Sequence, residues 1–451
     1  MQSLARARSL IPVTVLLAAL CGRQTATGAE PAPVAAAGGL PSWVVEMSVS
    51  AKESYDTNVQ GASAQGVSAT VPLAVANETA WVSTVGARFL FSLSDLGGLS
   101  KKLLVVGYAP TVFDFAGASS ENNTQHRFLL QSSGKASDFS WSLDSSTLYV
   151  DGSRDSLGYT NVSAFGAALP RERRAQWQYA DKLWVRCEAG NLFVRGCGNL
   201  LAYDLLTHHY NTAAPNYRNW QNFIDRYDIN GGFDLGWKVT KDAALTLGWR
   251  NGYQYQQAFD WSPAWRYNTS NHYQRVLLGL EGKLAPWLTV NVSGGPDSRR
   301  FDQPDASRGI VATRPTFAYV DGSVTAALGK NDSLVLLCKR WHWVSSVAKV
   351  IYDDHLWSLA WKHTFSPAWS LQLTGQALRA KYDTYPTAIS GVPRDDNLRI
   401  GTLQIQWVVN KQLTLVADYS LQQCYDTINL PACVGRDYHR QVTGVSAKYS
   451  F

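Results

Sequence analysis

The chain has 451 residues, of which 45% are hydrophobic, 12% are aromatic and only 17% are charged. Charged residues make up about 25% of a typical soluble domain, and intrinsic disorder is excluded because 17 Trp, 21 Tyr and 15 Phe bring a large apolar surface to bury. The net charge falls from +6 to +3 when Arg6, Arg8 and Arg23 near the N-terminus are set aside. So small a positive charge indicates no nucleic-acid partner.

The first 29 residues have the pattern of a secretory signal peptide. Arg6 and Arg8 precede the apolar residues 10–20, and small residues follow up to Ala29. The apolar run is too short for a transmembrane helix, which needs about 20 residues. We expect cleavage after Ala29, with Ala26 as the alternative.

Three regions follow from this leader: a signal peptide at 1–29, a flexible lead-in rich in Pro, Ala and Gly at 30–42, and one exported unit at 43–451. No later apolar stretch is long enough for a spanning helix. The mature chain is therefore either soluble or a closed β-barrel, and the period of its hydrophobic pattern distinguishes the two.

Apolar residues alternate with polar residues and glycines with a period of two. The pattern is clearest in residues 227–238, 288–293, 357–362, 402–407 and 413–420, with Val416 as the exception. A helix would require apolar residues at i+3 and i+4, and these segments do not show them. Each segment is therefore predicted to be a β-strand with one apolar and one polar face.

The connections between these strands alternate between short turns and long polar loops, as in outer-membrane barrels. The short turns are predicted at residues 95–98, 240–242, 285–286, 330–332, 366–368 and 410–412. The long loops are predicted at residues 57–76, 151–171, 207–220, 302–314, 386–396 and 424–436. The count is about 18 strands, from residues 43–55 to 439–451, and 16 is the alternative because residues 172–205 are ambiguous.

Soluble β-sandwiches, jelly rolls and propellers also contain alternating strands. Two features favour a membrane barrel: the apolar face recurs on nearly every strand, and aromatic residues gather near strand ends as a membrane girdle would. The girdle candidates are Trp237, Trp249, Trp287, Trp369, Trp407 and Tyr449. We predict an all-β fold, a transmembrane antiparallel up-and-down β-barrel in the bacterial outer membrane.

The C-terminus carries the same pattern, with Val445, Ala447, Tyr449 and Phe451 at alternate positions. This ending is similar to the β-signal that the barrel-assembly machinery reads in outer-membrane proteins. The resemblance implies that Tyr449 and Phe451 serve as the assembly signal.

The first strand adds a second resemblance. Residues 48–60 read SVSAKESYDTNVQ, which resembles the opening of porins of the OmpL-like type. Only this strand and the last strand carry the resemblance. It implies an outer-membrane channel and transfers no catalytic residues.

Motifs for chemistry are missing from the sequence. None of the 8 His falls in an HExxH pattern, and there is neither a GxSxG elbow nor a CxxCH haem site. We expect no catalytic residue, no metal and no cofactor. Two alternatives stay open, a barrel enzyme and a structural or adhesive surface barrel; an energised importer is disfavoured because no plug domain precedes residue 43.

Charged residues of both signs occupy the predicted inner face, where water or counter-charges can meet them. The predicted pore lining consists of Arg88, Arg226, Asp228, Asp234, Arg250, Asp321, Lys362, Asp418 and Arg440. The wider inward set adds Glu46, Lys52, Asp114, Asp144, Lys238, Arg275, Glu281, Lys283 and Lys448. Such residues either brace the wall as ion pairs or line a pore of mixed sign, which predicts passive diffusion of small hydrophilic solutes with weak ion selectivity.

Five cysteines remain after the leader. Cys424 and Cys433 flank the last long loop and are predicted to form a disulfide in an oxidising compartment. Pairing of Cys187 with Cys197 is left open, and Cys338 is expected to be an unpaired thiol in a strand. The expected partners are outer-membrane lipid, the barrel-assembly machinery and small solutes, and a homo-oligomer is left open.

Overall fold

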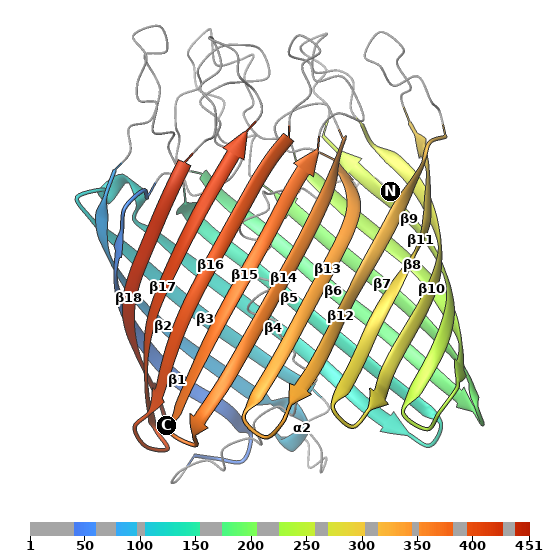
Figure 1. Cartoon of the computed structure of the whole chain (residues 1–451), viewed down its shortest axis with the longest axis horizontal. Helices are drawn as coiled ribbons and strands as arrows, with labels where there is room; N and C mark the ends of the chain where they lie inside the picture. The colour runs from blue at the N-terminus through green and yellow to red at the C-terminus, as the bar shows by residue number, and fades with distance from the viewer. Residues whose placement is uncertain are drawn as a thin grey trace, which may run out of the picture.

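A computed structural model describes residues 40–59, 78–96, 104–153, 174–204, 225–257, 269–302, 314–344, 351–381, 395–426 and 438–451. Within these residues, 18 strands form one sheet in which every strand pairs antiparallel with its sequence neighbours. β1 also pairs with β18, so the sheet closes into a barrel (Figure 1). The predicted fold class is confirmed with 18 strands, and the alternative of 16 is wrong because residues 174–204 form two strands.

The strands are β1 (Val44–Asp56), β2 (Ala80–Ser92), β3 (Leu104–Ala116), β4 (Asn123–Ala136), β5 (Phe139–Ser153), β6 (Arg174–Ala189), β7 (Leu192–Asp204), β8 (Arg226–Lys238), β9 (Ala243–Gln256), β10 (Asn271–Ala285), β11 (Leu288–Phe301), β12 (Thr316–Leu328), β13 (Asp332–Val344), β14 (Ile351–Ser366), β15 (Trp369–Lys381), β16 (Asp395–Val408), β17 (Leu413–Asp426) and β18 (Tyr438–Ser450). Two short helical turns accompany them, α2 (Leu93–Leu96) and η1 (Ser119–Glu121).

The alternation seen in the sequence separates an outer from an inner face. On β8 the apolar side chains of Ile229, Phe233, Leu235 and Trp237 are 44–52% exposed, whereas the even-numbered residues of this strand face the lumen. Large exposed apolar side chains recur on nearly every described strand. A soluble protein rarely exposes so much contiguous apolar surface, so the outer face is suited to lipid. Among the described residues, no helix is long and apolar enough to cross a membrane.

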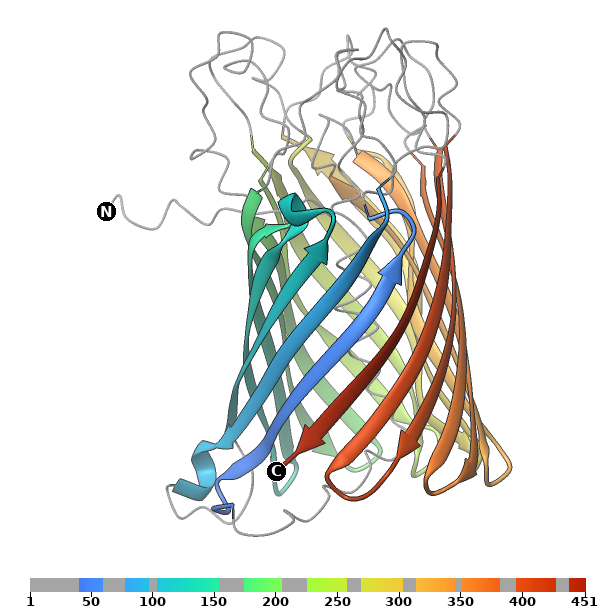
Figure 2. The same ribbon diagram turned by 90° about the vertical axis from the view of Figure 1, so that its left-hand side faces the viewer.

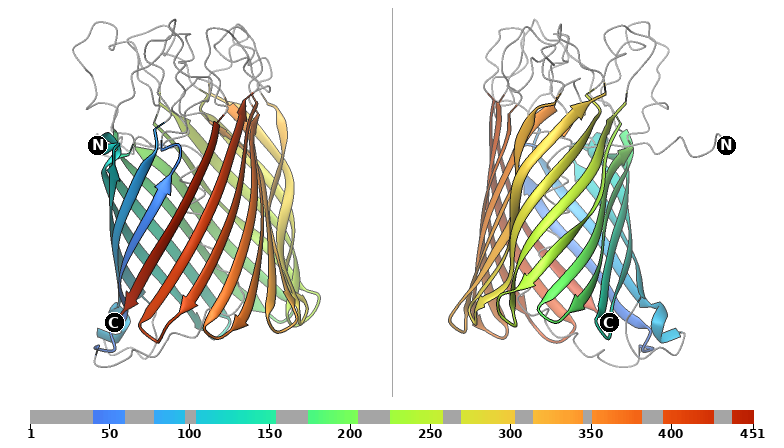
Figure 3. Two further views of the ribbon diagram at one scale, coloured as in Figure 1. Left: turned by 60° about the vertical axis from the view of Figure 1, so that its left-hand side comes forward. Right: turned by 90° about the vertical axis from the view of Figure 1, so that its right-hand side faces the viewer.

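Short turns join the strands at one end of the barrel, which we call the turn end (Figure 3). One of the two-residue turns joins β6 to β7, where Gly190 takes the left-handed φ of 61° that glycine tolerates best. The predicted turn at residues 95–98 is an exception, because the chain forms α2 there and β3 begins only at Leu104.

The barrel closes where β1 meets β18, and Figure 2 shows these two strands side by side. The backbone N–H of Phe451 donates to the carbonyl of Met47 at 3.0 Å, which extends the ladder to the last residue. On the inner face, Lys52 pairs with Asp418 at 2.7 Å and Arg440 pairs with Asp56 at 2.6 Å. Both ion pairs cross the seam, because Arg440–Asp56 joins β18 to β1 and Lys52–Asp418 joins β1 to β17, the strand beyond β18.

Aromatic side chains mark two levels on the outer face. Trp369 and Trp407 stack near the turn end with ring centroids 5.2 Å apart, and Tyr425 lies beside Asn397 toward the other end. Ten residues of tilted strand separate Asn397 from Trp407, a height of about 25 Å that matches the apolar band of outer-membrane barrels. Trp249 does not belong to either level, because it lies near the middle of β9.

Candidate functional site

The lumen is the candidate site, and the strand register places all nine residues of the predicted pore lining on the inner face. They do not form one ring. Seven of them lie in three places: Asp234 and Arg250 in a cluster between β6 and β10, Arg226 and Asp228 in a buried network near the end opposite the turns, and Arg88, Asp418 and Arg440 near the seam. Asp321 on β12 and Lys362 on β14 lie outside these three places. In the wider inward set Asp114 was wrong, because it pairs with Ser83 on the outer face of β2 and accepts from Asn122 at 2.6 Å.

Seven charged residues from β6 to β10 form the turn-end cluster: Arg186, Glu188, Arg195, Asp234, Lys238, Arg250 and Glu281. Asp234 is its centre, because its two carboxylate oxygens accept from Arg195 at 2.8 Å and Arg250 at 2.7 Å. Arg195 also reaches Glu281 at 2.8 Å, two strands beyond Asp234. The four basic and three acidic residues nearly balance, so the cluster braces the wall and leaves only a small positive excess.

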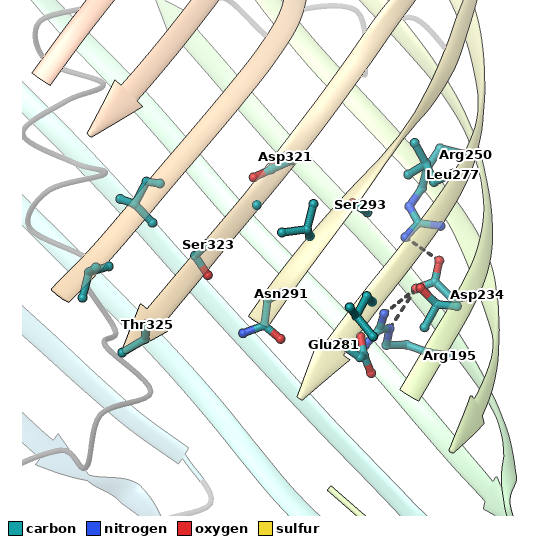
Figure 4. Close-up of a pocket in the computed structure, with 16 residues that line it drawn as sticks. Arg195, Asp234, Arg250, Leu277, Glu281, Asn291, Ser293, Asp321, Ser323 and Thr325 are labelled. Atoms are coloured by element: carbon teal, nitrogen blue, oxygen red, sulfur yellow. Dashed lines mark hydrogen bonds and ion pairs between the residues drawn. The ribbon is translucent and has the colours of Figure 1, made fainter. Parts of the chain in front are cut away.

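A cavity of about 410 Å³ lies beside this cluster in the lumen (Figure 4). Arg195, Asp234 and Arg250 line one side of it. The other side carries uncharged polar groups and one acid on β11 and β12, namely Asn291, Ser293, Asp321 and Ser323. Asp321 lies 3.9 Å from Lys339, so both sides offer hydrogen-bond donors and acceptors to a hydrated solute.

The ends of β13 and β14 turn away from β12 and into the lumen. β12 pairs with β13 only as far as Arg340, whereas β13 and β14 stay paired through Val344 and Ile351. We call residues 341–344 and 351–354 the tip. Its apolar side chains pack on the inner wall, where Ile351 contacts Phe301 and Phe317, so the tip fills one side of the lumen.

Because the tip is not paired with β12, its backbone carbonyls have no strand partner on that side. Inward-facing side chains donate hydrogen bonds to them instead. The carbonyl of His342 accepts from Gln254 and from Arg299, both at 2.9 Å. The carbonyl of Val344 accepts from Arg226 at 2.5 Å. The His342 ring also stacks on Phe317 with centroids 3.7 Å apart.

Behind the tip, the same side chains continue into a buried network. Asp297 is fully buried and accepts from Arg275 at 3.1 Å and from Arg299 at 2.8 Å. Asp228 accepts from Gln254 at 2.7 Å and from the Tyr273 hydroxyl at 2.6 Å. We call Arg226, Asp228, Gln254, Tyr273, Arg275, Asp297 and Arg299 the tip network. Buried charges of this kind persist when paired and hydrogen-bonded, so the network holds the tip against the wall.

The seam side of the lumen is more open. Arg88 pairs with Glu46 at 2.9 Å with 43% of its side chain exposed. Away from the seam, on the part of β14 near the turn end, Lys362 also faces the lumen, is exposed, and makes no ion pair within the described part of the chain. Water can therefore reach the charged groups at both places, unlike those behind the tip.

Sequence reasoning found Arg226 and Asp228 but missed Gln254, Asp297 and Arg299. Period-two alternation on β9 and β11 already puts these three on the inner face, so that signal was available. The alternation breaks at the tip, because Trp341 and Trp343 put apolar side chains at the parity of Lys339, and Asp353 and Asp354 are consecutive acidic residues on β14. This break signals an irregular strand end but does not indicate which wall the tip contacts.

The structure describes Cys187, Cys197, Cys338 and Cys424 of the predicted cysteine pairs and thiols. Cys424 lies on β17, while Cys433 lies outside the described residues, so their disulfide stays a prediction. Cys187 and Cys197 are free thiols on opposite faces of the wall, which excludes a bond between them. Cys338 is a thiol in β13. Within the described ranges, no group of three or more His, Cys, Asp or Glu could hold a metal.

Several solved structures are similar to this chain at low sequence identity. OpdK of Pseudomonas aeruginosa, solved with vanillate, is 10% identical, with a TM-score of 0.41 over 90% of this chain and 98% of that chain. OccAB3 of Acinetobacter baumannii is 11% identical, with a TM-score of 0.41 over 90% and 99%. The siderophore receptor PirA of P. aeruginosa is 8% identical, with a TM-score of 0.40 over 90% and 80%.

No family model and no curated protein matches the sequence. The class of the molecule therefore rests on its own geometry. It is a closed antiparallel β-barrel with an apolar outer wall and a polar lumen.

Proposed function

We propose that this chain is an outer-membrane channel through which small hydrophilic solutes diffuse passively. One observation carries the proposal: an 18-stranded closed barrel with exposed apolar side chains outside encloses a lumen lined by charges of both signs. A barrel of this strand number is wide enough for an aqueous channel. The tip narrows that channel on one side.

The placement in the membrane follows from the two aromatic levels and the leader. The signal peptide at residues 1–29 directs export, the turn end faces the periplasm, and Tyr449 and Phe451 carry the signal for the barrel-assembly machinery. The opening of β1 and the last strand support a porin of the OmpL-like type. The nine pore-lining residues then meet the solute or hold the wall beside its path.

We propose a channel and not an enzyme, and a liposome-swelling assay measures whether the barrel lets small solutes pass. Liposomes that contain the refolded protein should swell in isosmotic solutions of small sugars, and the rate should fall steeply as the sugar grows. Liposomes with heat-unfolded protein are the control. A folded barrel that leaves the liposomes impermeable to the smallest sugar would contradict the channel.

A further inference from the structure

A notch on the outer wall lies where two glycines face each other. Gly375 on β15 pairs with Gly401 on β16, and at either position a Cβ would meet nothing within 4 Å. Leu359 on β14 and Leu421 on β17 are the next partners on the two sides. Together they bound a groove of about 440 Å³ on the face that carries the exposed apolar side chains.

The edge of the notch toward Tyr425 carries two polar side chains, Arg399 and Gln423. Ala377, Arg399 and Gln423 form the next rung toward the Tyr425 level. Arg399 is exposed and lies over the Tyr425 ring at 5.7 Å, and it makes no ion pair with any described residue. The Tyr425 hydroxyl donates to Oε1 of Gln423 at 3.0 Å, which leaves the Gln423 amide nitrogen as a donor.

Other outward arginines near this edge are neutralised within the chain. Arg379 pairs with Asp395, and Arg340 pairs with Asp353 at 2.6 Å. A lone guanidinium at the boundary of the apolar band is costly unless a counter-charge from outside the protein meets it. Arginine suits phosphate oxygens because its planar fork can donate two parallel hydrogen bonds.

We propose that the notch binds a phosphate-bearing anionic lipid of the leaflet away from the turn end, with an acyl chain in the Gly375–Gly401 groove and a phosphate on Arg399 and Gln423. Arg399 lies at a suitable depth in the membrane for a phosphate, because it is one residue pair closer to the bilayer centre than Tyr425, where the headgroup and acyl regions meet. This proposal rests on the membrane placement proposed above.

Native mass spectrometry of the refolded barrel with added phosphatidylglycerol or phosphatidylcholine of the same chain length tests the site. The wild type should retain phosphatidylglycerol about fivefold better, as one exposed charge-assisted contact predicts. Arg399→Gln should abolish this preference, and Gly401→Leu should lower retention of both lipids. Gly196→Leu is the matched control, because Gly196 also faces outward with nothing within 4 Å of a Cβ.

Equal retention of both lipids by the wild type, or a preference that survives Arg399→Gln, would overturn the site. Dimers that disappear only in Gly401→Leu would assign the notch to a second copy and would also overturn it. Heat-modifiability on gels confirms that each variant is folded. Because conductance is measured separately, a barrel that selects phosphatidylglycerol without conducting would contradict the channel and leave the lipid site standing.

Discussion

Charges on the inner wall are shared between strands and rarely stand alone. Asp234 holds both Arg195 and Arg250, and Arg195 extends to Glu281. Gly248 is part of this arrangement, since a Cβ at that position would meet the Asp234 carboxylate. Pairing limits the field in the lumen, because each guanidinium has a carboxylate within hydrogen-bond distance.

Neutralising Arg88 and Arg250 together tests whether the paired charges still act on ions. The double variant Arg88→Gln, Arg250→Gln should shift the reversal potential in a salt gradient toward cations, because it removes two positive charges from the lumen wall. Arg300→Gln is the control, because Arg300 is exposed on the outer face of β11. An unchanged reversal potential would show that these residues do not lie on the ion path.

Cys424 and Cys433 provide the second test at this scale. We expect a disulfide between them that stabilises the barrel by about 2–3 kcal/mol through the entropy of the closed loop. Mass mapping of peptides from the non-reduced protein should contain the cross-linked pair. Alkylation of both residues without prior reduction would refute the bond.

At the scale of elements, the tip is the feature that departs most from a regular barrel. β13 leaves β12 at Arg340. Beyond that residue, side chains from β8, β9 and β11 donate the hydrogen bonds that the backbone of β12 no longer supplies. Arg299 contributes most directly, because it joins Asp297 to the carbonyl of His342.

Replacing Arg299 with Met should release the tip. The barrel should lose about 3 kcal/mol of stability, since breaking a buried ion pair leaves Asp297 undercompensated. Single-channel conductance should rise, because the tip no longer narrows the lumen. Arg300→Met is the matched control on the neighbouring outward position, and a conductance equal to that of the wild type in Arg299→Met would contradict a constricting tip.

The last strand supplies another element-scale prediction. Phe451→Asp should reduce the amount of protein assembled in the outer membrane while leaving export intact. Phe451 closes the seam ladder with Met47 and its ring contacts Tyr449 at a centroid distance of 5.1 Å. Fractionation and heat-modifiability measure assembly, and Ser450→Asp is the control because Ser450 faces the lumen. Normal membrane levels of Phe451→Asp would refute the assembly signal.

The sequence predicts the strands well but not where the tip packs, for one physical reason. Alternation reports which face of a strand meets lipid or water, so β8 and the last strand could be assigned residue by residue. It carries no information about which distant wall a strand end contacts. The bend at Arg340 and the partnership of Arg299 with His342 depend on that contact, and the groove between Gly375 and Gly401 depends on a register that only the fold supplies.

At the scale of the whole molecule, the barrel is wider in the view of Figure 1 than in that of Figure 2. The tip occupies the lumen on the side of β8 to β14, and the seam side carries exposed charges. The barrel therefore encloses a lumen narrowed from one side, with a cavity beside the turn-end cluster and nearly balanced charge on its wall.

Conductance of the refolded protein in planar bilayers tests this account most directly. We predict ohmic single-channel steps with weak ion selectivity, leaning slightly to anions because basic residues exceed acidic ones in the turn-end cluster. A barrel that refolds, shifts its mobility on gels when heated, and yet never conducts would contradict the channel.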